Sequence, residues 1–240
     1  MKAFLLAGGF GSRLRPLTDH TPKCLVKIAG KPLLQYWLEA LDEMPVEHIY
    51  INTHYLAAQV EQFVVSSRWH DKVTLIYEEN LLGTLGSVRC HRQVFDTEAT
   101  LIAHADNFCL TDWTQFAKTF YTRPAQCELT MMLFRTPTPW SCGIVQKDNN
   151  NVLQAYIEKP SDAQQHPDKY GDLANAAVML VSQRALDSIA EMPSSYDDLC
   201  RDYLPLQIAK ANVFVNNNVH IDVGTPETYQ LANEWANTHL

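Results

Sequence analysis

Short apolar runs and amphipathic stripes alternate along the first third of the chain. Residues 3–6 form a continuously apolar run, and the runs 49–51 and 73–77 place apolar residues at every second position, as strands do. Between these runs, apolar residues recur three and four positions apart in the segments 32–42 and 60–64, which places them on one face of a helix. Repeated strand–helix–strand units predict a parallel sheet with helices on both faces.

The rest of the chain continues this pattern and adds a hairpin. Two alternating runs, 142–145 and 152–157, flank the turn residues 148–151, which is the signal of an antiparallel β-hairpin. Further strands are predicted at 100–105, 129–134, 173–178, 213–215 and 219–223, and further helices at 112–121, 183–191, 197–204 and from Pro226 onward. The whole pattern predicts an α/β fold with a mixed, mostly parallel sheet.

Composition is that of an ordinary globular enzyme-sized domain. The chain has 240 residues, of which 46% are hydrophobic and 19% charged, so we expect a single domain over 1–240 with a large core. Its six cysteines are scattered and form no C-x-x-C pair. That spacing favours reduced thiols over a disulfide framework or a zinc site.

We do not expect the opening segment to be a signal peptide. The apolar run at the start stops at Gly8 and is shorter than the ~7–15 residues of a signal peptide core. No stretch approaches the ~20 apolar residues of a membrane span. We therefore expect a cytoplasmic protein with no membrane partner. No β-helix repeats follow the last predicted helix, and we expect no fused acyltransferase domain.

The loop after the first predicted strand is the most informative stretch of the sequence. It contains Gly8, Gly9 and Gly11, followed by Arg13 and Lys23. Glycines let a backbone approach a phosphate closely, and successive free N–H groups can then form an anion-binding concavity. A guanidinium fork and a lysine ammonium add charge suited to phosphate oxygens.

Charge distribution agrees with an anion site at this loop. Residues 1–31 contain six lysines and arginines against the single carboxylate of Asp19, whereas the whole chain has a net charge of −8. A positive spot on an acidic protein suits a small polyanionic ligand. It does not suit nucleic acid, which requires a wider basic face.

The loop can be compared with three other interpretations. It is not a Walker loop, because no Gly-Lys-Ser/Thr follows the glycines. The spacing between Gly8 and Gly11 also departs from the G-x-G-x-x-G pattern of dinucleotide-binding oxidoreductases. A glycine-rich turn with solvated cations is left open by the loop alone.

The sequence Leu-x-Gly-Gly-x-Gly-x-Arg-Leu-x-Pro-Leu-Thr at 6–18, followed by Pro22-Lys23 and Lys31-Pro32, resembles the signature of the sugar-1-phosphate nucleotidyltransferases, or nucleotide-sugar pyrophosphorylases. The pattern is most similar to that of mannose-1-phosphate guanylyltransferases. This resemblance implies a Rossmann-like, mostly parallel sheet flanked by helices, of the nucleotide-diphospho-sugar transferase type. It also implies a nucleotide-binding part over about 1–110 and a sugar-phosphate-binding part over about 111–240.

The resemblance assigns Arg13 and Lys23 to catalysis. It also points to a base-reading loop at 82–86, where Leu-Gly-Thr-x-Gly is common in members that transfer a guanylyl group. The purely structural alternative is a helix-capping turn in which Thr84 is the cap. The nucleotide-binding residues implied by the resemblance are Leu6, Ala7, Gly8, Gly9, Gly11, Ser12, Glu79, Gly83 and Thr84.

The resemblance further implies that Asp106 and Asp222 hold Mg²⁺. Asp106 follows the predicted strand 100–105, and Asp222 begins a block similar to the family's Asp-Ile-Gly-Thr-Pro. The family usually has Gly-Asp where this chain has Ala105-Asp106. Taken alone, Asp106 is more simply explained as the cap of the helix near 112–121.

The sugar phosphate is assigned by resemblance to four residues of the second half: Gly143, Glu158, Lys159 and Asn175. The first three belong to the hairpin, which ends in Glu-Lys-Pro as in the family. Asn175 begins a motif that is Asn-Ala-Gly in the family, but here Ala177 replaces the glycine. The alternatives are an exposed Glu-Lys pair and a backbone partner for the Asn175 amide.

The implied reaction is transfer of a nucleotidyl group from a nucleoside triphosphate, GTP by preference, to mannose or manno-heptose 1-phosphate. The products are a nucleoside-diphosphate sugar and pyrophosphate. Two alternatives remain open at this point: a cytidylyltransferase for phosphocholine or another small phosphate, and a non-catalytic nucleotide-sensing homologue. The sequence leaves the oligomeric state open and is compatible with a homodimer.

Overall fold

The computed structural model describes residues 1–240, with the side chains of residues 167 and 168 excepted. The chain forms two compact units, and each is assembled from separate stretches. The first unit comprises residues 1–81, 103–113 and 219–240, and the second comprises 82–102 and 114–218.

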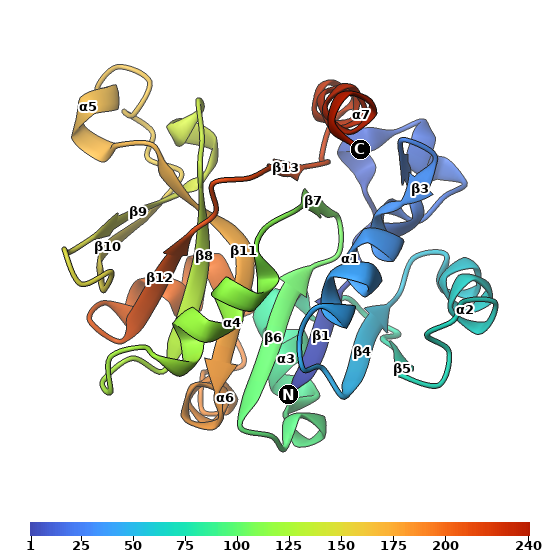
Figure 1. Cartoon of the computed structure of the whole chain (residues 1–240), viewed down its shortest axis with the longest axis horizontal. Coiled ribbons are helices and arrows are strands. Elements are labelled where there is room, and N and C mark those ends of the chain that lie inside the picture. The colour runs from blue at the N-terminus through green and yellow to red at the C-terminus, as the bar shows by residue number, and fades with distance from the viewer. The chain divides into compact units, whose positions relative to one another are not determined.

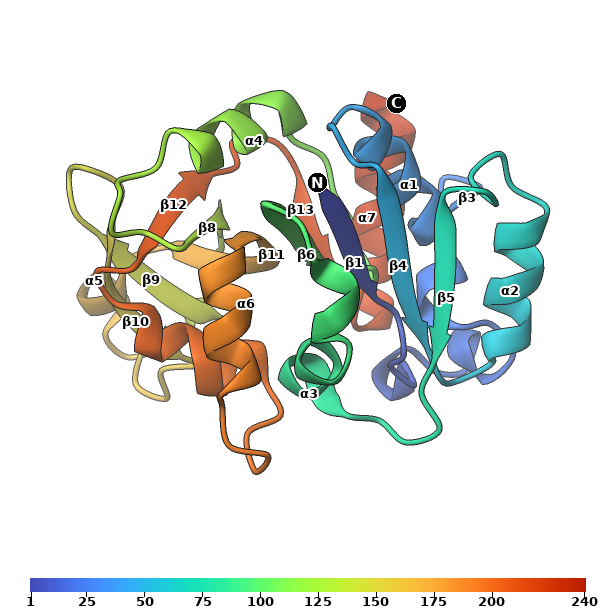
Figure 2. The ribbon, with the colours of Figure 1, turned by 90° about the horizontal axis from the view of Figure 1, so that it is seen from below.

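The first unit is built on parallel strands. β1 (Lys2–Leu6), β4 (His48–Thr53) and β5 (Val73–Tyr77) pair in parallel, with the end of β6 (Ala99–His104) next to β1. Figures 1 and 2 both show β1, β4 and β5 side by side. Residues 3–6 of β1 are buried, because a parallel strand of this kind is covered on both faces.

Three helices belong to this unit: α1 (Leu33–Asp42), α2 (Ala57–Val65) and α7 (Pro226–His239). α1 buries the stripe predicted from its sequence, and its Trp37 Nε1 donates to the backbone oxygen of Asn107 at 3.0 Å. Thr225 caps α7 by accepting from the backbone N–H of Thr228 at 3.3 Å.

Two small sheets complete the first unit. β2 (Lys27–Ile28) pairs with β3 (Lys31–Pro32), and β7 (Asn107–Cys109) pairs with β13 (His220–Asp222), both antiparallel. The second pairing sets Asp222 opposite Asn107. It therefore brings Asp222 close to Asp106, although more than a hundred residues separate them in the sequence.

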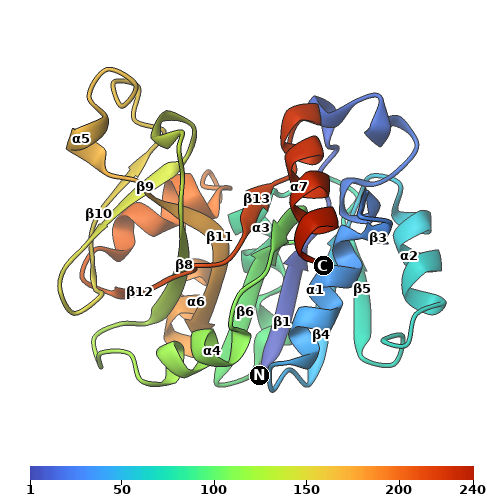
Figure 3. The ribbon, with the colours of Figure 1, turned by 45° about the horizontal axis from the view of Figure 1, so that its top comes forward.

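The second unit contains a mixed sheet. β9 (Gly143–Lys147) and β10 (Leu153–Glu158) form the predicted antiparallel hairpin, which Figure 3 shows edge to edge. β11 (Leu173–Ser182) runs antiparallel to both β9 and β8, and β12 runs parallel to β8. The other elements are β8 (Leu129–Arg135), β12 (Ala211–Val215), α3 (Gly83–Cys90), α4 (Trp113–Tyr121), α5 (Pro167–Tyr170) and α6 (Gln183–Ala190).

The predicted α/β class with a mixed sheet and flanking helices is confirmed. The predicted helix at 197–204 is wrong in type: the structure has a single π-helical turn over Leu199–Tyr203, then a 3-10 turn over Leu204–Gln207. Pro205 explains the break, because proline lacks the N–H that would continue a helix. In the described part of the chain, no helix has both the length and the apolar character of a bilayer span.

Candidate functional site

The glycine loop turns tightly at Gly11. This residue has φ +63°, and a Cβ there would lie 2.9 Å from Cγ2 of Thr18 and 3.2 Å from Cβ of Lys23. Thr18 is buried and its hydroxyl donates to the backbone oxygen of Gly11 at 2.8 Å. The loop therefore closes around Thr18 and requires glycine at its turn. Gly9 and Arg13 lie exposed on its outer side.

Asn52 holds the beginning of the loop. Its Oδ1 accepts from the backbone N–H of Ala7 at 2.7 Å, and a Cβ at Gly8 would lie 3.4 Å from its Nδ2. Asn52 is buried at the end of β4, beside the end of β1. Asn52 was not predicted as a site residue from the sequence. The available signal was a polar residue at the carboxyl end of an apolar strand.

Lys23 lies between the two predicted metal ligands. Its Nζ is 2.7 Å from Oδ2 of Asp106 and 3.3 Å from Oδ1 of Asp222, and only 8% of its side chain is exposed. Arg13 approaches the same cluster, with Nη2 3.9 Å from Oδ2 of Asp222. The structure thus brings the two predicted cations and the two predicted carboxylates together within the first unit.

The ionised forms of this cluster stabilise one another. Burial would lower the pKa of Lys23, but Asp106 and Asp222 raise it by more, and the net pKa lies above the usual value. Burial would likewise raise the pKa of Asp106, but Lys23, His104 and hydrogen bonds from Lys23 and the backbone bring it below the usual value. Lys23 is therefore an ammonium and Asp106 a carboxylate at neutral pH.

The two carboxylates fit a magnesium ion. Their side chains are 30% and 56% exposed for Asp106 and Asp222, so both oxygen donors can be reached from solvent. No group of three or more His, Cys, Asp or Glu side chains among the described residues could form a complete metal cage. Mg²⁺ commonly takes one or two protein carboxylates and completes its shell with water and substrate phosphates, which suits this pair.

In the second unit, Gly83 and Thr84 pack against the segment 197–199. Gly83 has φ +72°, and a Cβ there would overlap the backbone oxygen of Asp197. The Thr84 hydroxyl accepts from the backbone N–H of Leu199 at 2.8 Å. The alternative reading of Thr84 as a helix cap is wrong, because Leu82 occupies that position. Glu79, in the first unit, is exposed just after β5. The predicted role of this loop in base recognition stays a prediction.

Three of the predicted sugar-phosphate-binding residues lie around the side chain of Tyr156. Gly143 is paired with Glu158 across the hairpin. Tyr156 donates its hydroxyl proton to Oε2 of Glu158 at 3.0 Å and accepts from Nδ2 of Asn175 at 3.4 Å. Lys159 follows directly, with Nζ 3.5 Å from Oε1 of Glu158 and 65% of its side chain exposed. These residues form one cluster within the second unit.

Ala177 has the backbone conformation that glycine favours. Its φ is +53°, and its backbone N–H donates to Oδ1 of Asn175 at 3.0 Å. The register between β11 and β8 shifts between Asn175 and Met179, so this stretch is a local irregularity of the strand. The left-handed backbone explains why a glycine suits this position, and why alanine is strained here.

Tyr156 and Cys200 were missed by the sequence analysis. Tyr156 lies two positions before Glu158 on β10, so the period of a strand places both on one face, and this spacing could have identified it. Cys200 accepts from Nδ2 of Asn175 through its sulfur at 3.2 Å. Burial raises the pKa of this thiol to about 12, which keeps it neutral at pH 7. The sequence holds no signal for its position.

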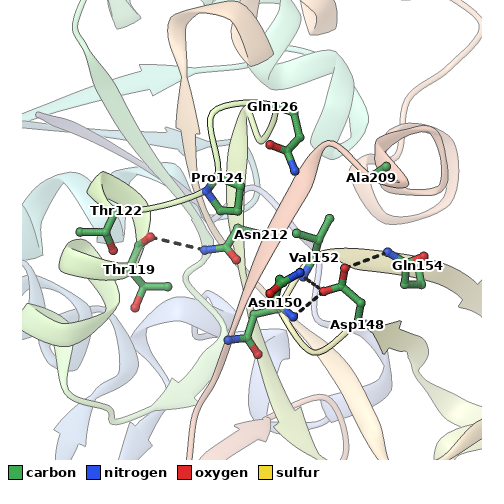
Figure 4. Close-up of a pocket in the computed structure, with 11 residues that line it drawn as sticks. Thr119, Thr122, Pro124, Gln126, Asp148, Asn150, Val152, Gln154, Ala209 and Asn212 are labelled. Carbon is green, nitrogen blue, oxygen red and sulfur yellow. Dashed lines mark hydrogen bonds between the residues drawn. The ribbon is translucent and has the colours of Figure 1, made fainter.

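A cavity of about 640 Å³ in the second unit is separate from this cluster (Figure 4). Its walls come from the hairpin turn, the end of α4 and the start of β12. Asp148 caps the turn by accepting from the backbone N–H groups of Asn150 and Val152, both at 2.8 Å. Among the described residues that line it there is neither a lysine nor an arginine, nor any predicted site residue, so it does not suit a phosphate ligand.

The sequence matches a known protein family over almost its whole length. The model of the family described as "Nucleotidyl transferase" matches residues 2–238. The chain belongs to the nucleotidyl transferase family. The resemblance stated from the glycine loop is thereby confirmed at the level of the family.

Relatives within the nucleotidyl transferase family include mannose-1-phosphate guanylyltransferases. The catalytic subunit beta of that name from Drosophila melanogaster is 27% identical over 234 residues, covering 95% of this chain and 60% of the relative. The same-named protein of Dictyostelium discoideum is 27% identical over 238 residues, covering 95% of this chain and 62% of the relative. The chain thus spans about six-tenths of the length of these curated relatives.

Solved structures share the fold. HddC from Yersinia pseudotuberculosis, crystallised in complex with GMP-PN, superposes with a TM-score of 0.78 at 24% identity, covering 98% of this chain and 99% of HddC. A Bacillus anthracis protein solved in complex with a sucrose gives a TM-score of 0.86 at 21% identity, covering 98% of this chain and 95% of that protein. The nucleotidyl transferase fold predicted from the sequence is therefore confirmed.

Proposed function

We propose that the protein transfers a nucleotidyl group from a nucleoside triphosphate to a sugar 1-phosphate. Family membership supports the class of reaction, and the names of the curated relatives support mannose 1-phosphate and a guanine nucleotide. The observation that carries the proposal is the position of Lys23 between Asp106 and Asp222, beside Arg13 and the glycine loop.

The chemistry needs charge neutralisation more than proton transfer. A phosphate oxygen of the sugar 1-phosphate bonds to the α-phosphorus, the bond from that phosphorus to the bridging oxygen of the β-phosphate breaks, and pyrophosphate leaves. The nucleophile is already ionised at neutral pH, because the second pKa of a phosphate monoester is near ~6. No protein base is therefore required, and the main obstacle is repulsion between two anions.

Each cation then has a role in overcoming this repulsion. Arg13 would hold the departing pyrophosphate through its planar fork, since its exposed guanidinium N–H groups can donate to phosphate oxygens. Lys23 would bind the α-phosphate as a compact charge. Lys159, which is also exposed, would bind the phosphate of the sugar substrate.

Asp106 and Asp222 would hold Mg²⁺, for which their oxygen donors and exposure are suited. When bound, that ion supplies further positive charge to the phosphate oxygens. Lys23 contacts both carboxylates in the free protein, so it would change partners from these carboxylates to the α-phosphate as substrate binds.

The hairpin cluster would recognise the sugar. Glu158 presents a carboxylate oxygen, Oε1, that can accept from a sugar hydroxyl, and Oδ1 of Asn175, which accepts from the backbone N–H of Ala177, can accept a second hydrogen bond. GTP is the preferred donor on two grounds: the Leu82-Gly83-Thr84 pattern and the names of the relatives. Mannose and manno-heptose 1-phosphates are the preferred acceptors.

A panel of substrates tests the proposal. Pyrophosphate release is measured with GTP, CTP, UTP, ATP and dTTP against mannose, manno-heptose and glucose 1-phosphates and phosphocholine, all with Mg²⁺. Release with GTP and a manno-configured phosphate supports the proposal in full. Release with CTP and phosphocholine identifies a cytidylyltransferase instead. Nucleotide binding without release from any pair identifies a nucleotide-sensing protein and contradicts the proposal.

A further inference from the structure

We propose that the hydroxyl of Tyr156 is a positioning group that sets Glu158 and Asn175 for the sugar phosphate. This inference rests on the proposed function, because it assigns Glu158 and Asn175 to the sugar. Tyr156 touches no reacting atom in this account and acts through its two neighbours. No motif in the sequence analysis included it.

The hydrogen bonds around Tyr156 have a defined direction. Asn175 Oδ1 accepts from the backbone N–H of Ala177, so its amide NH₂ points the other way, toward Tyr156 and Cys200. The Tyr156 oxygen accepts from that NH₂, and its single proton goes to Oε2 of Glu158. The tyrosine therefore links two residues that lie on different strands.

Burial keeps the Tyr156 hydroxyl protonated. Tyr156 is only 8% exposed. Burial, helped by Cys200 and Glu158, raises the pKa of its phenol well above the usual value. The hydroxyl therefore keeps its proton over the physiological pH range, and in the structure it donates that proton to Oε2 of Glu158.

One oxygen of Glu158 remains for ligand. Oε1 lies 3.5 Å from Nζ of the exposed Lys159 and accepts no hydrogen bond from Tyr156. A carboxylate oxygen can only accept, so the ligand group that meets it must be a hydrogen-bond donor, such as a sugar hydroxyl. The neighbouring ammonium suits an anionic group of the same ligand. A phosphorylated sugar supplies both.

Gly143 is explained by the same arrangement. A Cβ at this position would overlap the Tyr156 hydroxyl and lie 2.7 Å from Oε2 of Glu158. The missing side chain therefore gives room to the tyrosine–glutamate pair. Without the hydroxyl, the Glu158 side chain would be free to rotate into this space. Its carboxylate would then no longer keep a fixed orientation toward the ligand.

Tyr156→Phe tests the inference, because it keeps the buried ring and removes only the hydroxyl. We expect the KM for mannose 1-phosphate to rise about tenfold, which corresponds to ~1.4 kcal/mol of binding free energy, because Glu158 is no longer held in its orientation. The KM for GTP should stay within twofold of the wild-type value. Tyr170→Phe is the matched control: Tyr170 is 9% exposed and also donates to a carboxylate, that of Asp162. It should leave both KM values unchanged.

A double-mutant cycle separates positioning from a general structural effect. In a Glu158→Gln background, Tyr156→Phe should add less than twofold to the KM for mannose 1-phosphate, because the group it orients is already altered. Full additivity of the two changes would overturn the inference, and so would an unchanged KM in the single variant. Wild-type protein that neither binds nor turns over any sugar phosphate would instead refute the proposed function, and the inference with it.

Discussion

The ammonium of Lys23 lies 2.7 Å from the carboxylate of Asp106, although 83 residues separate the two in the sequence. The cation predicted to bind the α-phosphate and a carboxylate predicted to bind Mg²⁺ thus hold each other in the free protein. Asp222 joins them at 3.3 Å. If Asp106 binds a divalent ion and Lys23 binds the α-phosphate, as proposed, each event would break this ion pair, and the two events would be coupled.

Removing the ammonium should make the carboxylates better ligands. We expect Lys23→Met to raise the affinity of the substrate-free protein for Mn²⁺ about fivefold, since an ion pair of roughly 1 kcal/mol no longer competes. A titration with Mn²⁺, in which electron paramagnetic resonance reports the concentration of the free ion, measures this affinity directly. Lys27→Met, at an exposed position of β2, is the control and should have no effect. Weaker Mn²⁺ binding in Lys23→Met would contradict the coupling.

Ala177→Gly should stabilise the protein. Alanine at φ +53° is strained, and glycine adopts this conformation without a steric cost. We expect the free energy of unfolding to rise by up to ~1 kcal/mol, measured by urea denaturation. Ala176→Gly is the matched control: Ala176 is buried in the same strand, and its loss of a side chain should destabilise the protein. A destabilised Ala177→Gly variant would show that the contacts of the alanine side chain stabilise the protein by more than the left-handed backbone destabilises it.

The strands and helices were predictable because their signals are local. Apolar residues at every second position marked β4 and β5, and the stripe at 33–41 marked α1, since each pattern is set by the geometry of one element. The family resemblance identified Lys23, Asp106 and Asp222 as a set. It contained nothing about how they contact one another in the absence of substrate.

The contacts that organise the site are non-local and were not predictable from the sequence. Asp222 reaches Asp106 through the pairing of β13 with β7, two three-residue strands whose partners no periodicity reveals. Strand spacing places Tyr156 on the same face as Glu158, but its contact with Asn175 of β11 could not be read from the sequence. Residues 82–102 join the second unit although they precede the segment 103–113 of the first. Tertiary packing decides each of these arrangements, and the spacing of residues along the chain does not reveal them.

Gly143→Ala should damage sugar recognition and fold together. The new Cβ would displace the Tyr156 hydroxyl and Glu158, which we expect to cost ~1–3 kcal/mol of unfolding free energy and to raise the KM for the sugar phosphate. Gly171→Ala is the control: its φ of +74° makes alanine strained there, but no atom lies within 4 Å of the added Cβ. It should lower stability and leave the KM unchanged. Equal KM values for both variants would argue against a sugar site at the hairpin.

Acid should remove one contribution to the stability of the segment that packs on Gly83. Hydrogen bonds from Arg201, followed by those from the backbone of Asp198 and Asp197, lower the pKa of Asp202 to about 2. Its ordinary value in an unfolded chain is ~3.9. The contribution is therefore complete above about pH 4 and is lost as the pH falls toward 2. The difference in urea midpoint between wild type and Asp202→Asn should be present at pH 7 and shrink below pH 4. A difference that grows on acidification would contradict this sign.

Turnover by Lys23→Met tests the central claim most directly. Pyrophosphate release from GTP and mannose 1-phosphate is measured at saturating Mg²⁺ for wild type, Lys23→Met and Lys27→Met, with thermal unfolding to confirm that all three are folded. If Lys23 neutralises charge on the reacting phosphates, its loss should slow turnover by about 10²–10³-fold, while Lys27→Met keeps the wild-type rate. Turnover by folded Lys23→Met within a few-fold of wild type would contradict the account.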